Sequence, residues 1–441
     1  VTLFLAIVAL LRRRDQLERL VSALIIASLP IALYAVVQRF GLDPMPWLGD
    51  VTRRVASTMG NSIFVAAYLI MVVPVTLVRV IEALRHLERD ESQAAIYRVA
   101  GYLVLVFIQL AAIVLSQSRG PLLGLFGGLF FFLLLYAAVR GRRAMLTVLA
   151  VGGLLAAFLV VFNLKGSPLA PLRDVPYIGR LGQVFETESG TGRVRVLIWG
   201  GALELIGSDP VRMIIGHGPE TMHVVYNPFY PPELGNLESR NASPDRSHNE
   251  TLDVLAQLGL LGFVAHLVLW TSVFFFGLRW LDLIATPGER NLFLGLWLGG
   301  GALSAAGFAA LTGGMTYFGV ALPAGMIAGL MAYVAFRALR GWSAPENRTR
   351  LLLAGLLAGL IGHFIEIHFG IAIAATRTLS LTMMAMLVVV GGLAAERPEL
   401  LAAEEEAPVT AALDASRRSR QRARQPRGAK PTALVSHPGW L

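Results

Sequence analysis

The chain has 441 residues, of which 55% are hydrophobic and only 15% are charged, whereas about 25% of the residues in a soluble globular domain are charged. This composition excludes an ordinary water-soluble enzyme, a disordered protein and a fibrous protein. The absence of Cys excludes disulfide bridges, thiolate nucleophiles and thiolate metal sites. The net charge of +9 comes from 36 Arg and 2 Lys. In so apolar a chain it points to membrane orientation or anionic lipid ligands rather than to nucleic acid.

Long windows without charged residues recur along the chain, and a helix of about 20 apolar residues crosses the hydrocarbon core of a bilayer. The segment 1–11 is half a span, so we expect the sequence to start inside a helix, with one or more spans missing upstream. The window 291–336 is two spans long and divides at Thr312-Gly313-Gly314. The pattern predicts an all-α fold, a polytopic transmembrane helical bundle of about eleven spans with one large outer loop. Besides 1–11 and 291–336, the charge-free windows are 20–38, 55–78, 99–118, 120–139, 144–164, 254–278 and 378–395, and a further apolar window, 351–376, contains His363, Glu366 and His368.

The distribution of Arg and Lys predicts the orientation, because cytoplasmic loops carry an excess of both. If 12–19 faces the cytoplasm, alternation puts five short loops and the C-terminal tail on that side. Those five loops hold 17 of the 38 basic residues, and the opposite short connections hold 5. We therefore expect a multi-pass protein of the cell inner (plasma) membrane with a cytoplasmic C-terminus.

Four regions follow from this topology. Residues 1–164 are the N-terminal transmembrane helices, and 251–395 are the C-terminal ones. Residues 165–250 form a large periplasmic or extracytoplasmic loop, in which Val194–Ile206 is apolar enough for an amphipathic helix that lies on or dips into the membrane. Residues 396–441, with their acidic and then basic runs, are typical of a disordered basic cytoplasmic tail.

The charged and titratable residues whose position close to the membrane costs the most free energy all lie on the predicted outer side. Charged groups at membrane depth are expensive and tend to mark function. Arg119, in Ser118-Arg119-Gly120, lies between two spans with almost no loop, and we expect it to bind an anion. Arg193 and Arg195, two residues apart, offer planar guanidinium groups that suit phosphate oxygens. Trp199 is either a sugar-stacking residue or, more commonly, an interfacial anchor.

A third stretch, Asp245-Arg246-Ser247-His248-Asn249-Glu250, opens a spanning helix. His248 titrates near neutrality and suits a general base that takes a proton from a hydroxyl. Ser247 and Asn249 are plausible helix caps. A lone histidine at a helix start is more often structural, but Arg246 and the other outer arginines favour a functional interpretation here. Glu366 near the outer end of its helix shares a face with His363, and we expect it to pair with Arg377 or an outer arginine.

These motifs resemble those of the O-antigen ligase and polymerase superfamily, polytopic bacterial membrane glycosyltransferases. The resemblance is carried by Ser118-Arg119-Gly120, by Arg193 with Ile198-Trp199, and by Ser247-His248-Asn249 followed by Leu258-Gly259-Leu260-Leu261-Gly262. Arg54, in Arg54-Val55-Ala56-Ser57, fits the family's pattern on an earlier outer connection. The resemblance covers roughly residues 50–395.

The resemblance implies a glycosyltransferase of polysaccharide biosynthesis in the cell envelope, with no metal and no cofactor. The donor would be an undecaprenyl-diphosphate-linked glycan, and the acceptor a growing glycan or a lipid-anchored sugar. Arg119 and Arg193 would hold the leaving diphosphate, and His248 would orient or deprotonate the acceptor hydroxyl. The expected substrate-binding residues are Arg54, Arg195, Arg246, Trp199 and Asn249.

Two alternatives remain open at this point. Ligase and polymerase share the donor anchor and the scaffold, so the sequence does not separate them. A transporter or flippase of lipid-linked glycans would need polar groups spread through several spans. The nearly charge-free spans favour chemistry at the membrane surface over that alternative.

Overall fold

The computed structural model describes residues 1–47, 49–175, 177–184, 186–238, 242–342 and 347–396. Within these residues every regular element is a helix, which confirms the predicted all-α class. Residues 1–395 form one compact unit. The predicted basic tail lies outside the described residues from position 397 on.

Ten helices in the described part of the chain are long and apolar enough to cross a membrane. The remaining predicted segment, 1–11, forms the nine-residue helix α1 (Thr2–Leu10). The window 291–336 divides where we expected, because α12 (Gly300–Thr312) ends at Gly313 and α13 begins at Phe318. The ten are α2 (Arg14–Arg39), α3 (Ser62–Leu87), α4 (Gln93–Leu115), α5 (Arg119–Arg140), α6 (Arg142–Asn163), α10 (Glu250–Trp280), Pro287–Thr312 with α11 (Pro287–Leu294), the π-helical turn Gly295–Gly299 and α12, then α13 (Phe318–Leu339), α14 (Arg348–Glu366) and α15 (Ala374–Glu396).

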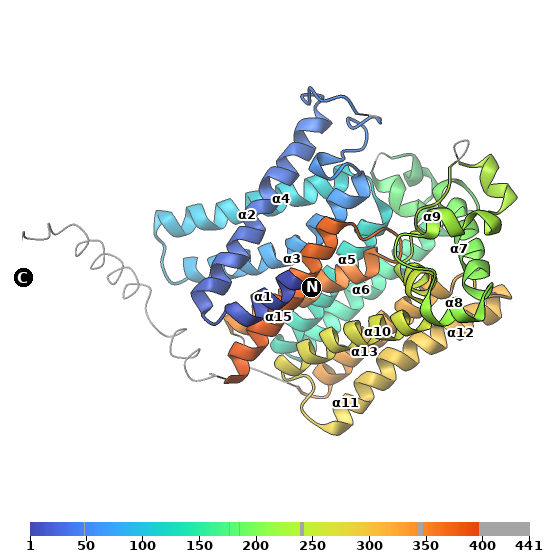
Figure 1. Cartoon of the computed structure of the whole chain (residues 1–441). Helices are drawn as coiled ribbons and strands as arrows, with labels where there is room; N and C mark the ends of the chain where they lie inside the picture. Colours follow the sequence, from blue (N-terminus) through green and yellow to red (C-terminus); the bar gives the residue numbers. More distant parts are fainter. Residues whose placement is uncertain (48, 176, 185, 239–241, 343–346, 397–441) are drawn as a thin grey trace, which may run out of the picture. The chain divides into compact units, whose positions relative to one another are not determined.

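The two most buried spans are α3 and α14, and α14 packs against both α3 and α5 (Figure 1). Small residues make this close packing possible. A Cβ at Gly124 of α5 would lie 2.4 Å from the carbonyl oxygen of Gly362, and one at Gly359 of α14 would lie 2.5 Å from that of Met71. This packing brings the start of α5 and the end of α14 to the same end of the bundle.

The loops alternate between two ends of the bundle, which we call inner and outer after the predicted sides. At the inner end, Arg348 donates to Glu18 of α2 (3.1 Å) and to Glu82 of α3 (2.9 Å), and Arg79 pairs with both carboxylates. Loops far apart in the sequence but of the same predicted side therefore meet. At the outer end, Asn249 Nδ2 donates to the carbonyl of Gly319, 2.8 Å away.

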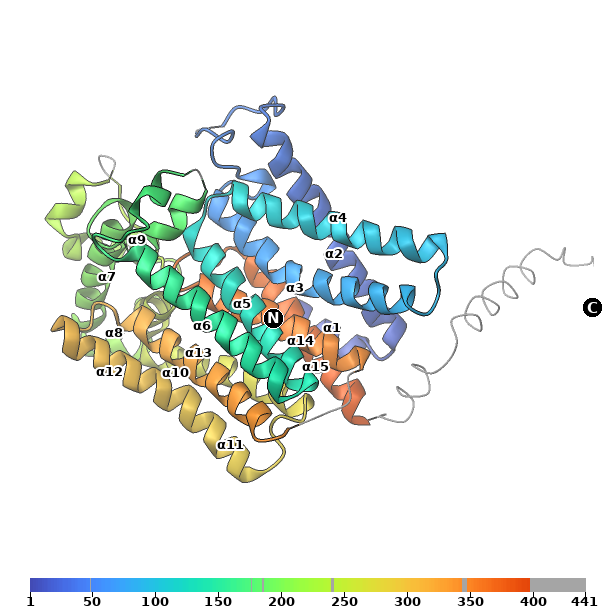
Figure 2. The ribbon, with the colours of Figure 1, turned by 180° about the vertical axis from the view of Figure 1, so that it is seen from behind.

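The described residues between α6 and α10, which we call the outer segment, lie together at one end of the bundle, in green in Figures 1 and 2. Its longest helix is α7 (Gly190–Gly207). The apolar face of α7, with Ile198, Ala202 and Leu205, is buried against Tyr226 and neighbouring residues of the same segment. The expectation that this face contacts lipid was therefore wrong, because the protein itself covers it.

The shorter helices of the outer segment are α8 (Pro210–Ile215), α9 (Met222–Val225) and the 3-10 turns Ala170–Asp174, Ile178–Gln183, Asn227–Phe229 and Pro232–Asn236. In contrast to α7, α8 exposes large apolar side chains, namely Val211, Met213, Ile214 and Ile215. It is the part of the outer segment whose surface suits the membrane interface.

Helix α10 is broken at Gly259, which has φ 64° and ψ −165°. The break frees two carbonyl groups, and the loop after α8 uses them: His217 N donates to Ala256 O and Gly218 N to Gln257 O, both at 2.9 Å. The first turns of α10 thus belong structurally to the outer segment. They start at Glu250, two residues after His248.

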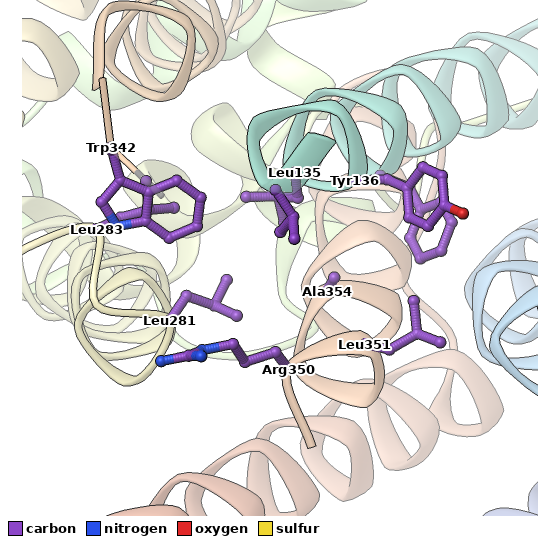
Figure 3. Close-up of a pocket in the computed structure, with 10 residues that line it drawn as sticks. Leu135, Tyr136, Leu281, Leu283, Trp342, Arg350, Leu351 and Ala354 are labelled. Atoms are coloured by element: carbon purple, nitrogen blue, oxygen red, sulfur yellow. The ribbon is translucent and has the colours of Figure 1, made fainter. Parts of the chain in front are cut away.

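A small apolar cavity lies at the inner end of the bundle (Figure 3). Leu135 and Tyr136 of α5, Leu281 after α10 and Leu351 of α14 line it. Arg350 at its edge pairs with Asp282. None of the expected site residues contributes to this cavity, which is at the end opposite to theirs.

Candidate active site

Arg119 is the first residue of α5 and connects the bundle to the outer segment. Its guanidinium donates to the carbonyl of Gln183 and to Thr191 Oγ1, the latter at 2.6 Å. These contacts hold the stretch before α7 against the start of α5. They place Arg119 at the start of α7, where its charge acts on Arg195.

Arg54 reaches the same place from the connection between α2 and α3. It donates weakly to Ser116 O and to Ser118 Oγ, each 3.4 Å away. The connection is held in shape by buried Gln38, whose Oε1 accepts from the backbone N–H of Ser57 at 2.7 Å. Burial lowers the pKa of Arg54, and the positive charges of Arg180 and Arg119 lower it further.

Arg180 was not among the expected site residues. It lies in the 3-10 turn Ile178–Gln183, half-buried, and its charge acts on both Arg54 and Arg119. The described residues offer it neither a hydrogen bond nor an ion pair. Nothing in the local sequence distinguished it from the other outer arginines, because only the folding of 165–189 onto α5 brings it there.

The two arginines of α7 have different surroundings. Arg193 forms a two-pronged ion pair with Glu233, at 2.9 and 2.6 Å, which raises its pKa. Arg195 has no hydrogen bond or ion pair with any described residue. Burial lowers the pKa of Arg195 to about 10, and the neighbouring charge of Arg119 contributes to the shift. Among the described residues, Arg195 is thus a neighbour of Arg119 without an acidic partner, whereas Arg193 pairs with Glu233.

His248 lies next to Arg195, in a turn with a φ of 56°. Burial and the charge of Arg195 lower the pKa of His248 to about 4. Its Nδ1 is buried and lacks a hydrogen-bond partner among the described residues. The imidazole is therefore neutral at pH 7 and free to accept a hydrogen bond.

The turn that carries His248 is held from several sides. Trp199 Nε1 donates to Ser247 O at 3.0 Å, and Asp253 Oδ1 accepts from Ser247 N at 2.7 Å. Asn249 caps α10 by accepting from Leu252 N and donates to the carbonyls of Gly319 and His368. The Trp199 side chain is only 5% exposed. Trp199 therefore fixes the His248 turn by a hydrogen bond, and its buried ring does not offer an exposed face on which a sugar could stack.

Arg246 is also tied down within the outer segment. It is buried and forms an ion pair with Glu220. This contact joins the His248 turn to the loop that fills the break in α10. Arg246 and Arg193 thus both have acidic partners, Glu220 and Glu233.

We call Arg54, Arg119, Arg180 and Arg195 the arginine cluster. Within the described part of the chain, no carboxylate lies within ion-pair distance of any of the four. Glu186 acts on Arg119 and Glu366 on Arg195 only through space. Like charges in a partly buried site repel one another strongly. The arginine cluster therefore suits a ligand with several negative charges. The neutral imidazole of His248 lies next to one of its members, Arg195.

The O-antigen ligase family model matches residues 104–267, a stretch that includes α5, the outer segment and His248. No curated protein and no solved structure matches the chain. The matched stretch contains three of the four cluster arginines together with the imidazole. This match, on a bundle of ten span-length helices in the described residues, supports the resemblance to the O-antigen ligase and polymerase superfamily.

Proposed function

We propose that this protein transfers a glycan from an undecaprenyl-diphosphate carrier to a hydroxyl acceptor at the outer face of the inner membrane. The observation that carries the proposal is the arginine cluster, four guanidinium groups without an acidic partner in the described residues, beside the neutral His248. A diphosphate supplies the negative charge that these groups lack. The acceptor is a lipid-anchored sugar or another growing glycan.

Arg119 and Arg195 are the residues to which we assign the diphosphate. We assign to Arg195 the role expected of Arg193, because Arg193 pairs with Glu233, whereas Arg195 has no ion pair with any described residue and is adjacent to Arg119. Arg54 and Arg180 extend the same positive surface and suit the second phosphate. Cations fixed in place before the reaction stabilise the charge that develops on the leaving diphosphate.

His248 is the residue to which we assign the acceptor hydroxyl. The acceptor oxygen attacks the anomeric carbon of the donor sugar, and the bond from that carbon to the diphosphate oxygen breaks. The hydroxyl proton passes to the imidazole as the new glycosidic bond forms. Because the pKa of His248 is low, the imidazole acts mainly by orienting the hydroxyl and by accepting its proton late in the step.

We further propose that the transfer needs no metal ion. The guanidinium groups supply the positive charge that a divalent cation provides in other diphosphate-using enzymes. Transfer measured in the presence of EDTA should therefore equal transfer in its absence. A loss of activity that added Mg²⁺ or Mn²⁺ restores would overturn this part of the proposal.

The decisive experiment is an assay of the purified protein with a polyprenyl-diphosphate glycan and separate candidate acceptors. We expect sugar to appear on one acceptor class, which also separates ligase from polymerase. Arg119→Ala and His248→Ala should abolish transfer without loss of expression or membrane insertion. If the protein instead moved the intact donor across sealed vesicles without transferring sugar, the flippase alternative would replace the proposal.

A further inference from the structure

Helix α8 carries an apolar face that no described residue covers. All six residues of the helix are exposed, and Asp209 caps its start by accepting from Val211 N at 2.7 Å. Val211, Ile214 and Ile215 are spaced i, i+3 and i+4, so their side chains lie on one face of the helix. Exposed apolar side chains that gather on one face indicate a surface with a partner. The transfer mechanism above gives this face no role.

The C-terminal end of α8 is packed tightly against the break in α10, and both views show the two helices side by side (Figures 1 and 2). A Cβ at Gly259 would lie 2.4 Å from the carbonyl carbon and oxygen of Ile214. One at Gly216 would lie 2.2 Å from the carbonyl oxygen of Gln257. Because only glycine lets two backbones approach so closely, the position of α8 along α10 is fixed at Gly259.

Helix α10 changes its surroundings at the same residue. Before the break, residues 250–257 are buried except for half-buried Leu255, and Glu250 pairs with Arg377 at 3.0 Å. The expected pairing of Arg377 with Glu366 was therefore wrong. The part of α10 that faces lipid begins at the break. The large apolar side chains exposed after it are Leu260, Leu261, Val264, Val268 and Leu269.

The length of α10 places the break at the outer boundary of the hydrocarbon core. Arg279, the basic residue of the last turn, marks the inner end of the helix. Gly259 precedes Arg279 by 20 residues, which is about 30 Å of helix. The hydrocarbon core of a bilayer has about this thickness. Since α8 is fixed at Gly259, its apolar face lies at the depth where acyl chains meet head groups.

We propose that the partner of α8 is the bilayer, and that Val211, Ile214 and Ile215 lie among the acyl chains of the outer leaflet. The face continues the lipid-facing surface of α10 and lies at the boundary of the hydrocarbon core, which favours lipid over a protein partner. Amphipathic helices occupy this boundary with their apolar face about 5–10 Å deep. The helix thus anchors the outer segment to the membrane surface.

A short loop connects this anchor to the candidate active site. Glu220, five residues after the end of α8, forms an ion pair with Arg246, which precedes His248 by two residues. Glu220 N also donates to Gln257 Oε1 at 3.1 Å. The depth of α8 in the leaflet therefore sets the height of the His248 turn above the membrane. This second step rests on the proposed function, whereas the lipid contact does not.

The test of the lipid contact makes use of the absence of Cys from the chain, since one introduced Cys takes a fluorescent label at one position only. Ile215→Cys is the probe on α8. Val224→Cys on α9 is the control in the outer segment, and Val268→Cys on α10 is the control within the hydrocarbon core. The three native side chains are similarly exposed, at 52%, 62% and 59%. Each labelled protein is placed in phosphatidylcholine nanodiscs that carry a nitroxide either high on the acyl chain or near its end.

We expect the α8 label to lose more fluorescence to the nitroxide near the head group than to the deeper one. The label at 268 should show the reverse order, because it lies about 14 Å beyond Gly259 along the helix. The label at 224 should be quenched by neither nitroxide. An α8 label that behaves like either control would overturn the lipid contact. Val211→Cys, on the same face, gives the same reading if Ile215→Cys does not fold.

The link to the active site is tested by Ile215→Asp, with Val224→Asp as the matched control. In nanodiscs Ile215→Asp should lower kcat for transfer by about tenfold or more, because a charge drives α8 out of the leaflet and misplaces the His248 turn. Val224→Asp should transfer like the wild type. Equal transfer by the two variants would overturn the link. A protein whose α8 label is quenched as expected but that transfers no sugar would refute the proposed function, and the link with it, and leave the lipid contact standing.

Discussion

Trp199 on α7 donates its indole N–H to the carbonyl oxygen of Ser247, 3.0 Å away, in the residue directly before His248. The helix that carries Arg195 is thereby fastened to the turn that carries the imidazole. One hydrogen bond thus links the proposed diphosphate side of the site to the proposed acceptor side. We therefore expect Trp199 to fix the distance between Arg195 and His248 through this hydrogen bond.

Replacing Trp199 by Phe removes this hydrogen bond and keeps an aromatic ring in the buried space. We expect a loss of about 1 kcal/mol in the free energy of unfolding. We expect a larger effect on kcat than on KM for the donor, because the His248 turn loses its fixed position while the arginine cluster stays intact. Unfolding midpoints and steady-state kinetics with a fixed acceptor measure the two effects. A variant whose KM for the donor rises while kcat stays unchanged would argue for direct sugar contact.

The pair Arg193 and Arg195 separates an anchoring arginine from a ligand-binding one on the same helix. Arg195→Gln should reduce kcat/KM for the donor by about 100-fold or more, as expected for the loss of one fixed cation at a leaving group. Arg193→Gln should cost less than about tenfold, because it breaks an exposed ion pair with Glu233. The two substituted positions lie two residues apart on α7, and both variants replace Arg by Gln, so each is the other's control. An effect of Arg193→Gln as large as that of Arg195→Gln would contradict the geometric assignment.

The sequence predicted the bundle well and the site only in outline, for a physical reason. Spans and their alternation follow from local hydrophobicity and charge, and α12 and α13 separate at the predicted glycines. Which arginine faces the site depends on tertiary partners instead. Arg193 and Arg195 look equivalent in sequence, and only the position of Glu233 forty residues away distinguishes them. Arg180 is similar, since no periodic pattern marks the turn that brings it to Arg119.

The membrane contact expected for α7 illustrates the same limit. Its apolar residues indicated a partner correctly, but hydrophobicity does not say whether that partner is lipid or protein. In the structure Tyr226 and Leu234 cover that face, and α8 carries the exposed apolar side chains. The sequence of a helix indicates which of its residues are buried. Whether lipid or protein buries them depends on how the rest of the chain folds.

The pH dependence of transfer should reflect the low pKa of His248. With a pKa of about 4 in the folded protein, the imidazole stays neutral and competent from neutral pH down to about 4. The acid limb of kcat/KM should therefore lie near pH 4 and not near 6.5, the ordinary value for His. Arg195→Gln removes a neighbouring positive charge, so any residual activity should show this limb at higher pH.

The same pKa shift has a consequence for stability. Between pH 6.5 and 4 the unfolded chain takes up a proton on this histidine and the folded protein does not. The contribution of His248 to the free energy of unfolding therefore falls as the pH is lowered through that window. His248→Gln should flatten this part of the stability curve. If the acid limb of kcat/KM in the wild type instead lies near pH 6.5, the imidazole is not buried beside a cation.

Two adjacent glycines of α7 test whether the docking of this helix sets the position of Arg195. A Cβ at Gly201 would lie 2.3 Å from the carbonyl oxygen of Phe229 and 2.5 Å from Tyr226 Oη, whereas one at Gly200 would meet nothing within 4 Å. Gly201→Ala should therefore push α7 away from its support, lower the free energy of unfolding by about 2 kcal/mol and reduce transfer. Gly200→Ala should leave transfer unchanged and stabilise the helix by up to about 1 kcal/mol, because Ala has the higher helix propensity. Equal effects of the two substitutions on transfer would mean that the site tolerates a displaced α7, and Arg195 would then lose its place as a fixed cation.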